Sequence, residues 1–398
     1  MIRAVVVSSQ WPSGGRSGVA LVAAAHARWL AEAGMAVSIV GSDDAVLSED
    51  LPVVSRHAVP ARGSGALYAP AVVDRRGLAA TLAPLNPDLV IVEAWQTALT
   101  DATVEVAHAA GWPVLMVSHG ISLSPARADL GQWARALLWS YYRFVRFPRL
   151  LGGIDRLTAL DLEATSARFY DRDRARARGI PVSLVTNTAV HHAPGYVPRD
   201  QRLRQILLVG YFSPIKNQRA ALRLVPDLPD DVTLLLVGRR SGRYYEQCVR
   251  TVERRGWSGR VTFRADDECD LSTEIARSAV VLSTSITEVM PITLLEAMAA
   301  GTPFVATPVG AVPSLEGGAL AHDRPSFRRA LCTFLDDPDA WQVASEAGRA
   351  RVLRQFQPER VRGQFLAAVE ATLASRRGAA AVPAPTHRSD ADRSGGML

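Results

Sequence analysis

Two successive series of short apolar runs, alternating with helical patterns, constrain this chain more than any other feature. The first series opens with a buried-strand pattern at residues 2–8. It continues with apolar residues at helical spacing between Leu21 and Leu30, and returns to a strand pattern at 37–40. Further strand runs lie at 89–92, 114–117 and 183–185. Strands separated by helices form parallel sheets covered on both faces, so this half predicts a doubly wound domain.

A second series begins after residues 188–202, a stretch of low periodicity that is typical of a connection between domains. Its strand runs lie at 205–209, 233–237, 261–263, 279–283 and 303–307. The pattern predicts an α/β protein of two doubly wound domains, with a ligand cleft at the carboxyl ends of the strands.

These patterns also predict the limits of the domains. We expect an N-terminal domain over 1–190, a C-terminal domain over 200–355, and a helix over 356–376 that packs back on the N-terminal domain. Residues 378–398 are poor in large apolar side chains, which predicts a disordered tail.

Charge and hydropathy narrow the classes of partner. The net charge of +6 fits a nucleic acid, an anionic lipid or a phosphorylated substrate, and charge alone does not choose among them. No apolar stretch is long enough to span a bilayer, and the apolar run at the N-terminus is too short for a signal peptide. We therefore expect a cytoplasmic protein, with a position at the inner face of the plasma membrane as the alternative to a free one.

Metal and disulfide chemistry find little support in the sequence. The three cysteines, Cys248, Cys269 and Cys332, are widely spaced and form no metal-ligand pattern, which predicts buried or half-buried free thiols. Two Asp-x-Asp triplets, at 171–173 and 390–392, lie in a charged stretch and in the predicted tail. We therefore expect no metal site and no cofactor.

The segment 287–310 carries the most chemical information. Its sequence predicts a strand that ends near Ser285, a turn that carries Glu288, and a helix that starts at Pro291 and contains Glu296. The free N–H groups of such a helix start attract an anion, and two nearby carboxylates can accept hydrogen bonds from sugar hydroxyls.

This segment resembles the retaining glycosyltransferase family 4 of the GT-B fold. The family has two glutamates eight positions apart, followed by Ala-Met-Ala-x-Gly-x-Pro, and 288–303 match that pattern. The resemblance implies that Glu288 contacts the donor sugar catalytically and that Glu296 binds the nucleotide ribose. It also implies further donor contacts in the helix start, at Pro291, Ile292, Thr293 and Leu294.

A second match lies at 209–218, where a strand ends in Val209-Gly210 and the only lysine of the chain, Lys216, follows. A lysine there can place a compact positive charge against a diphosphate. The resemblance implies that Gly210, Lys216 and Gly238 contact the donor. The family also has an arginine directly after the first glycine, where this chain has Tyr211. Arg239 or Arg240 could compensate for the missing charge.

Two features of the N-terminal half complete the resemblance. Gly14, Gly15 and Gly18 follow the first strand run, and the distance back from Gly34 favours Ser17-Gly18 as the donor-facing pair. His119 follows the strand run 114–117, and the resemblance implies a catalytic position beside the transferred sugar. An imidazole at a strand end can donate to a phosphate or a sugar hydroxyl.

Residues 127–149 interleave arginines with aromatic and aliphatic side chains. Such a segment either packs on the core with a basic solvent face or lies on an anionic membrane, where it would meet a lipid-linked acceptor.

The resemblance as a whole implies a retaining hexosyltransferase that uses a UDP- or GDP-type nucleotide sugar without a metal. The expected acceptor is a saccharide or a lipid-linked hydroxyl in the bacterial cell envelope, and no nucleic acid is expected as a partner. A sugar-nucleotide epimerase and an inactive GT-B binding protein remain as alternatives. A paired-carboxylate hydrolase would have no use for a diphosphate lysine, and a Rossmann dehydrogenase would need a Gly-x-Gly-x-x-Gly after a strand.

Overall fold

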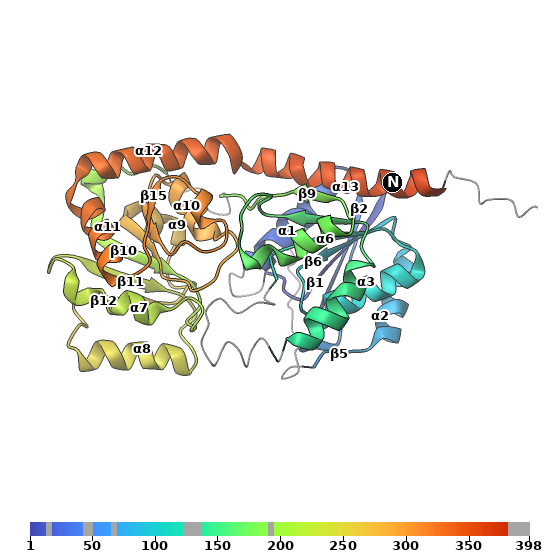
Figure 1. The fold of residues 1–398 in the computed structure, drawn as a ribbon, viewed down its shortest axis with the longest axis horizontal. Helices are drawn as coiled ribbons and strands as arrows, with labels where there is room; N and C mark the ends of the chain where they lie inside the picture. The colour runs from blue at the N-terminus through green and yellow to red at the C-terminus, as the bar shows by residue number, and fades with distance from the viewer. Residues whose placement is uncertain are drawn as a thin grey trace, which may run out of the picture.

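The structure is a computed structural model of the 398-residue chain. It describes residues 1–12, 18–42, 51–64, 70–121, 137, 139–189 and 195–380, and the side chains as far as 375. The chain forms two α/β domains, and the last two long helices run along one side of both (Figure 1).

The N-terminal domain is built on a parallel sheet with strand order β3-β2-β1-β6-β7-β8-β9. The strands are β1 (Arg3–Ser8), β2 (Ala36–Ser42), β3 (Ser55–Val59), β6 (Leu89–Glu93), β7 (Val114–Val117), β8 (Arg156–Ala159) and β9 (Val182–Leu184). A separate small hairpin joins β4 (Ala61–Arg62) and β5 (Val72–Val73). The central strands β1 and β6 are buried on both faces, which is why they are continuous apolar runs.

Helices cover both faces of this sheet. The first face packs on α2 (Arg75–Leu82), α3 (Ala98–Ala110), the π-helical turn η2 (Tyr142–Arg146), α5 (Phe147–Leu151) and α6 (Tyr170–Ala177). The second face packs on α1 (Gly18–Glu32) and on α13 (Pro358–Ala380), whose Val361, Phe365 and Val369 are buried. The core of the N-terminal domain therefore includes residues from the far end of the chain.

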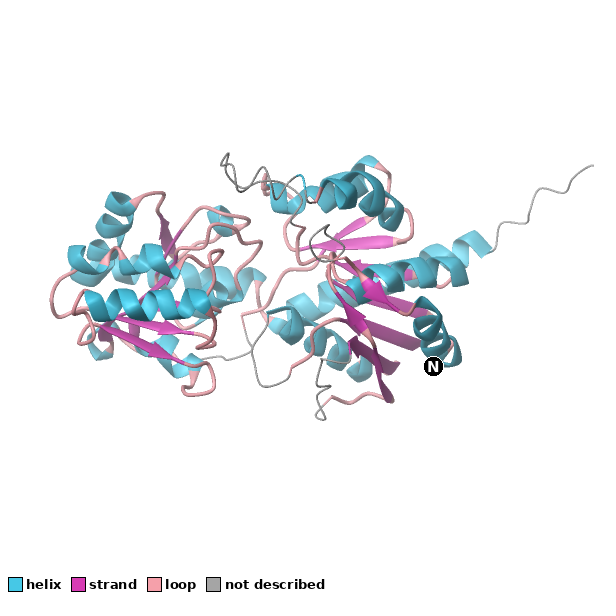
Figure 2. Cartoon of the chain, turned by 90° about the horizontal axis from the view of Figure 1, so that it is seen from below, coloured by secondary structure: helices cyan, strands magenta, loops and turns pink. Residues whose placement is uncertain are grey.

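The C-terminal domain has a parallel sheet with strand order β12-β11-β10-β13-β14-β15. The strands are β10 (Leu203–Val209), β11 (Thr233–Val237), β12 (Val261–Arg264), β13 (Ser278–Ser283), β14 (Phe304–Ala306) and β15 (Gly318–Leu320). One face carries α7 (Gln218–Leu222), α8 (Arg243–Arg254), α11 (Arg324–Asp336) and the start of α12 (Pro338–Gln355). The other face carries α9 (Leu271–Arg277) and α10 (Ile292–Ala299). Figure 2 shows the two sheets as separate units.

The chain passes between the domains twice. The first passage follows β9 and leads to β10, and the second joins α12 to α13. The two passages touch, because the Thr188 hydroxyl donates to the Phe356 carbonyl at 3.1 Å. Leu160 and Phe169 of the N-terminal domain share an apolar cluster with Val289 and Met290 of the C-terminal domain. The two domains are therefore in direct contact.

Each strand run predicted from the sequence coincides with a strand of these sheets, and the predicted fold class is confirmed. Three parallel strands were not predicted: β3, β8 and β15. They are short, lie at or near the edges of their sheets, and contain polar residues or small ones such as Gly318 and Ala319. The cysteine prediction is also confirmed, since Cys248 is buried and Cys269 and Cys332 are partly buried free thiols.

Candidate functional site

Lys216 and Glu288 lie together on the C-terminal domain, which forms one wall of the cleft between the domains. The Lys216 ammonium Nζ lies 2.5 Å from the Glu288 carboxylate Oε1, and both side chains are mostly buried. The two loops that carry them are joined, because Ile286 N donates to the Ile215 carbonyl at 2.8 Å and the Thr284 hydroxyl donates to the Lys216 carbonyl at 3.1 Å. Residues 72 positions apart thus form one charged pair at the ends of β10 and β13.

Three glycines allow the loops around Lys216 and Glu288 to approach one another closely. Gly210 has a φ of 151°, and a Cβ there would lie 3.2 Å from the Lys216 stem. A Cβ on Gly238 would come within 2.3 Å of the Gly210 carbonyl, and one on Gly310 (φ 60°) within 2.3 Å of the Glu288 carbonyl. A larger residue at Gly238 or Gly310 would displace backbone next to Lys216 or Glu288, and one at Gly210 would press on the Lys216 side chain.

Helix α10 begins directly behind this pair. Pro291 has an extended φ and ψ of −68° and 117° and occupies the N-cap, where its missing N–H is not needed. Thr293 is partly buried, and Leu294 and Glu296 are buried in the same helix. Gly18 at the start of α1 packs directly against this helix, because a Cβ there would lie 3.3 Å from Cδ1 of Ile292. The structure therefore sets the N-terminal ends of α1 and α10 against each other.

The N-terminal wall holds His119 through a buried carboxylate. His119 Nε2 lies 2.9 Å from Glu93 Oε2, and the other oxygen, Oε1, lies 2.7 Å from Nδ1 of His26 on α1. Glu93 is fully buried, and the His26 and His119 side chains are 2% and 11% exposed. Burial alone would raise the pKa of Glu93, but the two histidines outweigh it and lower that pKa to about 2.

Sheet register places these groups. Glu93, the last residue of β6, pairs in register with Val117, the last residue of β7, and His119 follows two positions later. The chain then turns sharply, since Ala94 and Gln96 adopt left-handed φ values of 71° and 66°. Such backbone costs energy in residues other than glycine and is concentrated at functional sites.

A second buried carboxylate, Asp171 on α6, holds the loop that carries His119. It accepts hydrogen bonds from the Ser118 hydroxyl and, at 2.7 Å, from the Trp95 indole N–H. The Ser118 oxygen accepts in turn from Gly120 N at 3.0 Å. Burial raises the pKa of Asp171. These bonds fix the backbone on both sides of His119.

The two walls meet at Gly120. A Cβ on this residue, which has a φ of 80°, would lie 2.3 Å from the Val289 side chain and 3.2 Å from the Arg168 carbonyl. Arg168 belongs to the N-terminal domain, yet its guanidinium lies in the field of Glu288 and Tyr211 of the other wall. Burial lowers its pKa, and the charges of Glu288, Asp171 and Tyr211 oppose that shift. Arg168 thus brings a cation of the N-terminal domain within electrostatic range of Glu288 and Tyr211.

Beside this contact lies a cavity of about 790 Å³ between the domains. Its walls include the loop 160–168 from the N-terminal domain, and residues 286–287 and 308–311 from the C-terminal domain. The cavity is large enough for a sugar or a nucleotide fragment.

The predicted residues fall into two groups. Lys216, Glu288, Gly210 and Gly238 form one cluster, and Gly18 faces the start of α10. His119 lies on the opposite wall, near Gly120 and Val289. Gly14, Gly15, Ser17 and residues 127–136 lie outside the described residues. The roles assigned to these residues stay predictions.

The suggested compensation by Arg239 or Arg240 finds less support in the geometry. Arg240 pairs with Glu268, and both side chains are more than 40% exposed. Sequence reasoning missed Glu93, His26, Asp171 and Arg168. Asp171 was set aside with the Asp-x-Asp triplet at 171–173, and the other three have no local motif, although Glu93 could have been noticed as a carboxylate at the end of an apolar strand.

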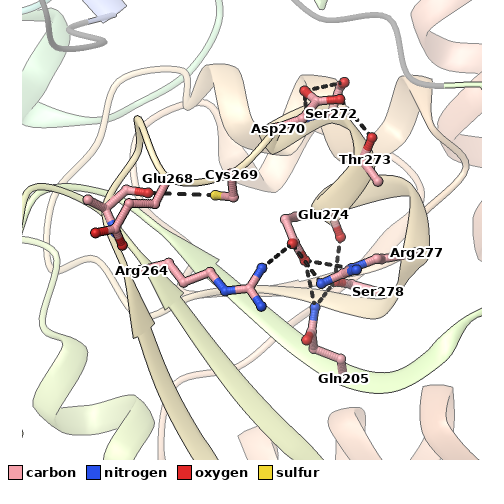
Figure 3. Close-up of polar contacts among 11 residues, drawn as sticks. Gln205, Arg264, Glu268, Cys269, Asp270, Ser272, Thr273, Glu274, Arg277 and Ser278 are labelled. Atoms are coloured by element: carbon pink, nitrogen blue, oxygen red, sulfur yellow. Dashed lines mark hydrogen bonds and ion pairs between the residues drawn. The ribbon is translucent and has the colours of Figure 1, made fainter.

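Another buried carboxylate, in the C-terminal domain, provides a contrast. Glu274 on α9 accepts from Arg264 and Arg277 at 2.8 and 2.7 Å, and from Gln205 Nε2 at 3.3 Å (Figure 3). This network ties α9 to β10 and β12. Within the described residues no group of three or more His, Cys, Asp or Glu side chains is placed to hold a metal ion.

Comparisons with known proteins agree with this architecture. Residues 204–337 match the family model described as glycosyl transferases group 1. The chain is 32% identical to D-inositol 3-phosphate glycosyltransferase of Mycolicibacterium smegmatis over 160 residues, which is 37% of this chain and 36% of that protein. The same enzyme of Mycobacterium tuberculosis is 33% identical over 121 residues, 29% and 25% of the two chains. The matches thus span about a third or less of these relatives.

Solved structures cover nearly the whole chain. Sucrose-phosphate synthase of Thermosynechococcus elongatus superposes with a TM-score of 0.67 at 18% identity, over 96% of this chain and all of that one. Anabaena HepE, crystallised with UDP and glucose, gives 0.69 at 18% identity, over 93% and 100%. Both overlays span the two sheets and the cleft between them. This chain has the GT-B fold.

Proposed function

We propose that this protein is a glycosyltransferase that moves a hexosyl group from a nucleotide diphosphate sugar to a hydroxyl, with retention at the anomeric carbon. The observation that carries the proposal is the Lys216–Glu288 pair, which precedes the start of α10, where Ile292 lies against Gly18 of the other domain. Lysine, helix N–H groups and a carboxylate in one place suit a donor that has both a diphosphate and a sugar.

In this proposal some residues bind the diphosphate of the donor and others bind its sugars. Lys216 and the first N–H groups of α10 balance the diphosphate charge, while Glu288 and Glu296 accept hydrogen bonds from the hexose and the ribose. His119 acts from the other wall on the transferred sugar. The stabilisation of the leaving diphosphate by fixed cations lowers the barrier without a metal ion.

Arg168 completes the charge balance. A nucleoside diphosphate carries more than one negative charge, and Lys216 already faces Glu288. The guanidinium of Arg168, near Glu288 and Tyr211, adds a second cation from the opposite domain. Domain closure would then bring the two cations to the same diphosphate.

Two of the comparisons bear on the classes of donor and acceptor. HepE was crystallised with UDP and with UDP-glucose, which favours a UDP donor here over a GDP donor. The mycobacterial relatives act on an inositol phosphate, a hydroxyl acceptor with an anionic group. A saccharide or lipid-linked acceptor of the bacterial envelope fits the basic chain.

Calorimetric titration with UDP, GDP and ADP tests the donor site. We expect one nucleotide to bind, and Lys216→Ala to weaken it about 10- to 100-fold, the effect of losing one charge-assisted contact. Arg250→Ala, an exposed arginine on α8, changes the net charge equally and should have no effect. Absence of binding by every nucleotide would refute the proposal.

Product analysis then separates transfer from its alternatives. Incubation of the sugar nucleotide with candidate acceptors should give a product whose anomeric configuration, read by NMR, equals that of the donor. The reaction should continue in EDTA. An inverted product would exclude retention, and interconversion of sugar nucleotides without an acceptor would indicate an epimerase.

Membrane contact is a separate proposal. Among the described residues, no helix combines the length and apolarity that a bilayer crossing requires. Around η2, Trp139, Tyr142 and Phe147 are buried, whereas Leu137 and Phe144 are 69% and 68% exposed beside Arg143. We expect binding to anionic vesicles at low salt that weakens in Phe144→Ser. Equal indifference to anionic and neutral vesicles would contradict this surface.

A further inference from the structure

The side chains of Glu93, His26 and Phe365 form a continuous buried chain behind His119. Glu93 uses one carboxylate oxygen for each histidine, at 2.9 Å for His119 and 2.7 Å for His26. The ring of His26 stacks on Phe365 of α13, with centroids 3.9 Å apart and an interplanar angle of 5°. These contacts therefore connect His119, at the edge of the cleft, to the C-terminal helix α13.

Each contact restricts the next. His26 sits on α1 with its ring between Glu93 and Phe365, so it has little freedom to rotate. Glu93 is fully buried, and both of its oxygens are engaged. Because the Glu93 carboxylate accepts a hydrogen bond from Nε2–H of His119, the ring is held in one orientation and Nδ1 is the nitrogen that can meet a ligand.

We propose that Glu93 and His26 are positioning residues that fix the orientation and tautomer of His119 for sugar transfer, with Phe365 clamping His26 from α13. Only His119 would touch the substrate. This inference rests on the proposed function for its kinetic consequences, but the orientation of His119 can be measured without any substrate.

Two features of the site favour a positioning role over a purely structural one. The partners of Glu93 are histidines, and one of them lies at the end of β7 next to Gly120, where the two walls meet. Glu93 is also followed by left-handed Ala94 and Gln96, a strained turn that aims the end of β6 at the cleft. A carboxylate that only stabilised the core would need neither feature.

The test uses the full chain with Glu93→Gln, His26→Gln and Phe365→Leu. Side-chain ¹⁵N NMR should show His119 with its proton on Nε2 in the wild type. In Glu93→Gln we expect this signature to be lost and kcat to fall about 10- to 100-fold, the usual effect of removing an orienting partner, with donor KM within about twofold. His26→Gln should have a smaller effect, and Phe365→Leu the smallest.

Two controls separate positioning from general loss of stability. Glu274→Gln removes a buried carboxylate of the C-terminal domain that is bonded to Arg264, Arg277 and Gln205, and Val369→Ala trims a buried side chain of α13 one turn beyond Phe365. Both should lower the melting temperature without changing kcat or the His119 signals.

Each outcome decides a different question. An unchanged His119 signature and an unchanged kcat in Glu93→Gln would overturn the positioning role. Equal kcat losses in Glu93→Gln and Glu274→Gln would also overturn it, since they would indicate a stability effect. If the wild type transfers no sugar, the proposed function fails, yet the NMR comparison still decides whether Glu93 holds His119.

Discussion

Glu93 and Glu274 are two buried glutamates in equivalent kinds of fold, and their partners differ in a telling way. Glu274, on a helix that covers one face of the second sheet, pairs with Arg264 and Arg277, which are permanently charged. Glu93 pairs with two histidines, which can change charge, at the end of a central strand that meets the cleft. A buried carboxylate with arginine partners joins secondary-structure elements, whereas one with histidine partners at a cleft orients side chains that can act on a ligand.

The largest effect should come from Glu274→Ala. Removing the carboxylate leaves Arg264, Arg277 and Gln205 without their common acceptor. Loss of one partner from a buried pair costs about 3 to 5 kcal/mol, and we expect about 3, because both arginines can turn to solvent. Chemical denaturation measures the loss. A reduced kcat per folded molecule would break the distinction between the two glutamates.

A third buried carboxylate, Asp101 on α3, should change stability over the pH range 5 to 7. Burial raises the pKa of Asp101 to about 7, against the attraction of Arg146 and the hydrogen bond from Tyr142. A raised folded-state pKa gives stability that is present below the ordinary value of 3.8 and lost as pH rises through 7.

We therefore expect the unfolding free energy of the wild type, relative to Asp101→Asn, to fall by about 2 to 3 kcal/mol between pH 5 and pH 7. Parallel melts of the two proteins across this range give the difference. A constant difference would mean that Asp101 stays ionised throughout, like a carboxylate with a permanent arginine partner.

Ionisation of Glu93 should give the opposite pH dependence: the unfolding free energy should fall as the pH is lowered. Its pKa of about 2 lies below the ordinary value of 4.5, so its contribution is present above pH 4.5 and lost as the pH falls towards 2. Relative to Glu93→Gln, the wild type should lose about 2 kcal/mol of unfolding free energy between pH 4.5 and pH 3. Urea titrations at several pH values measure this. A gain in relative stability on acidification would contradict the histidine pairing.

The smallest effect should come from the exposed pair Arg240 and Glu268. Both side chains are more than 40% exposed, so solvent screens their attraction. Arg240→Ala should cost less than about 0.5 kcal/mol and leave nucleotide affinity unchanged. A clear loss of nucleotide affinity would show that Arg240, and not Arg168, supplies the charge missing at Tyr211.

The sequence predicted most of the fold, because the central strands of parallel sheets are continuous apolar runs that stand out from their surroundings. It also predicted that Lys216 and Glu288 belong together, since both follow strand ends within recognisable motifs. The edge strands β3 and β15 were not predicted, because half-buried strands contain fewer apolar residues.

The buried contacts that join His119, Glu93 and His26 could not be predicted from local sequence patterns. His26 and Glu93 are 67 residues apart, and only the pairing of β6 with β7 and the packing of α1 bring them to His119. A single histidine on an apolar helix is more often part of the core than of a site, so nothing in its neighbourhood distinguishes His26. Arg168 was missed for a similar reason, because its relation to Tyr211 exists only across the contact between the domains.

The return of α13 to the first domain has a consequence for synthesis on the ribosome. The N-terminal sheet is translated by residue 184, but Val361, Phe365 and Val369, which cover one of its faces, emerge only after the entire second domain. Nascent chains usually fold from the N-terminus onward, domain by domain. Here the second domain can close first, while the first domain waits with an open apolar face for the end of the chain.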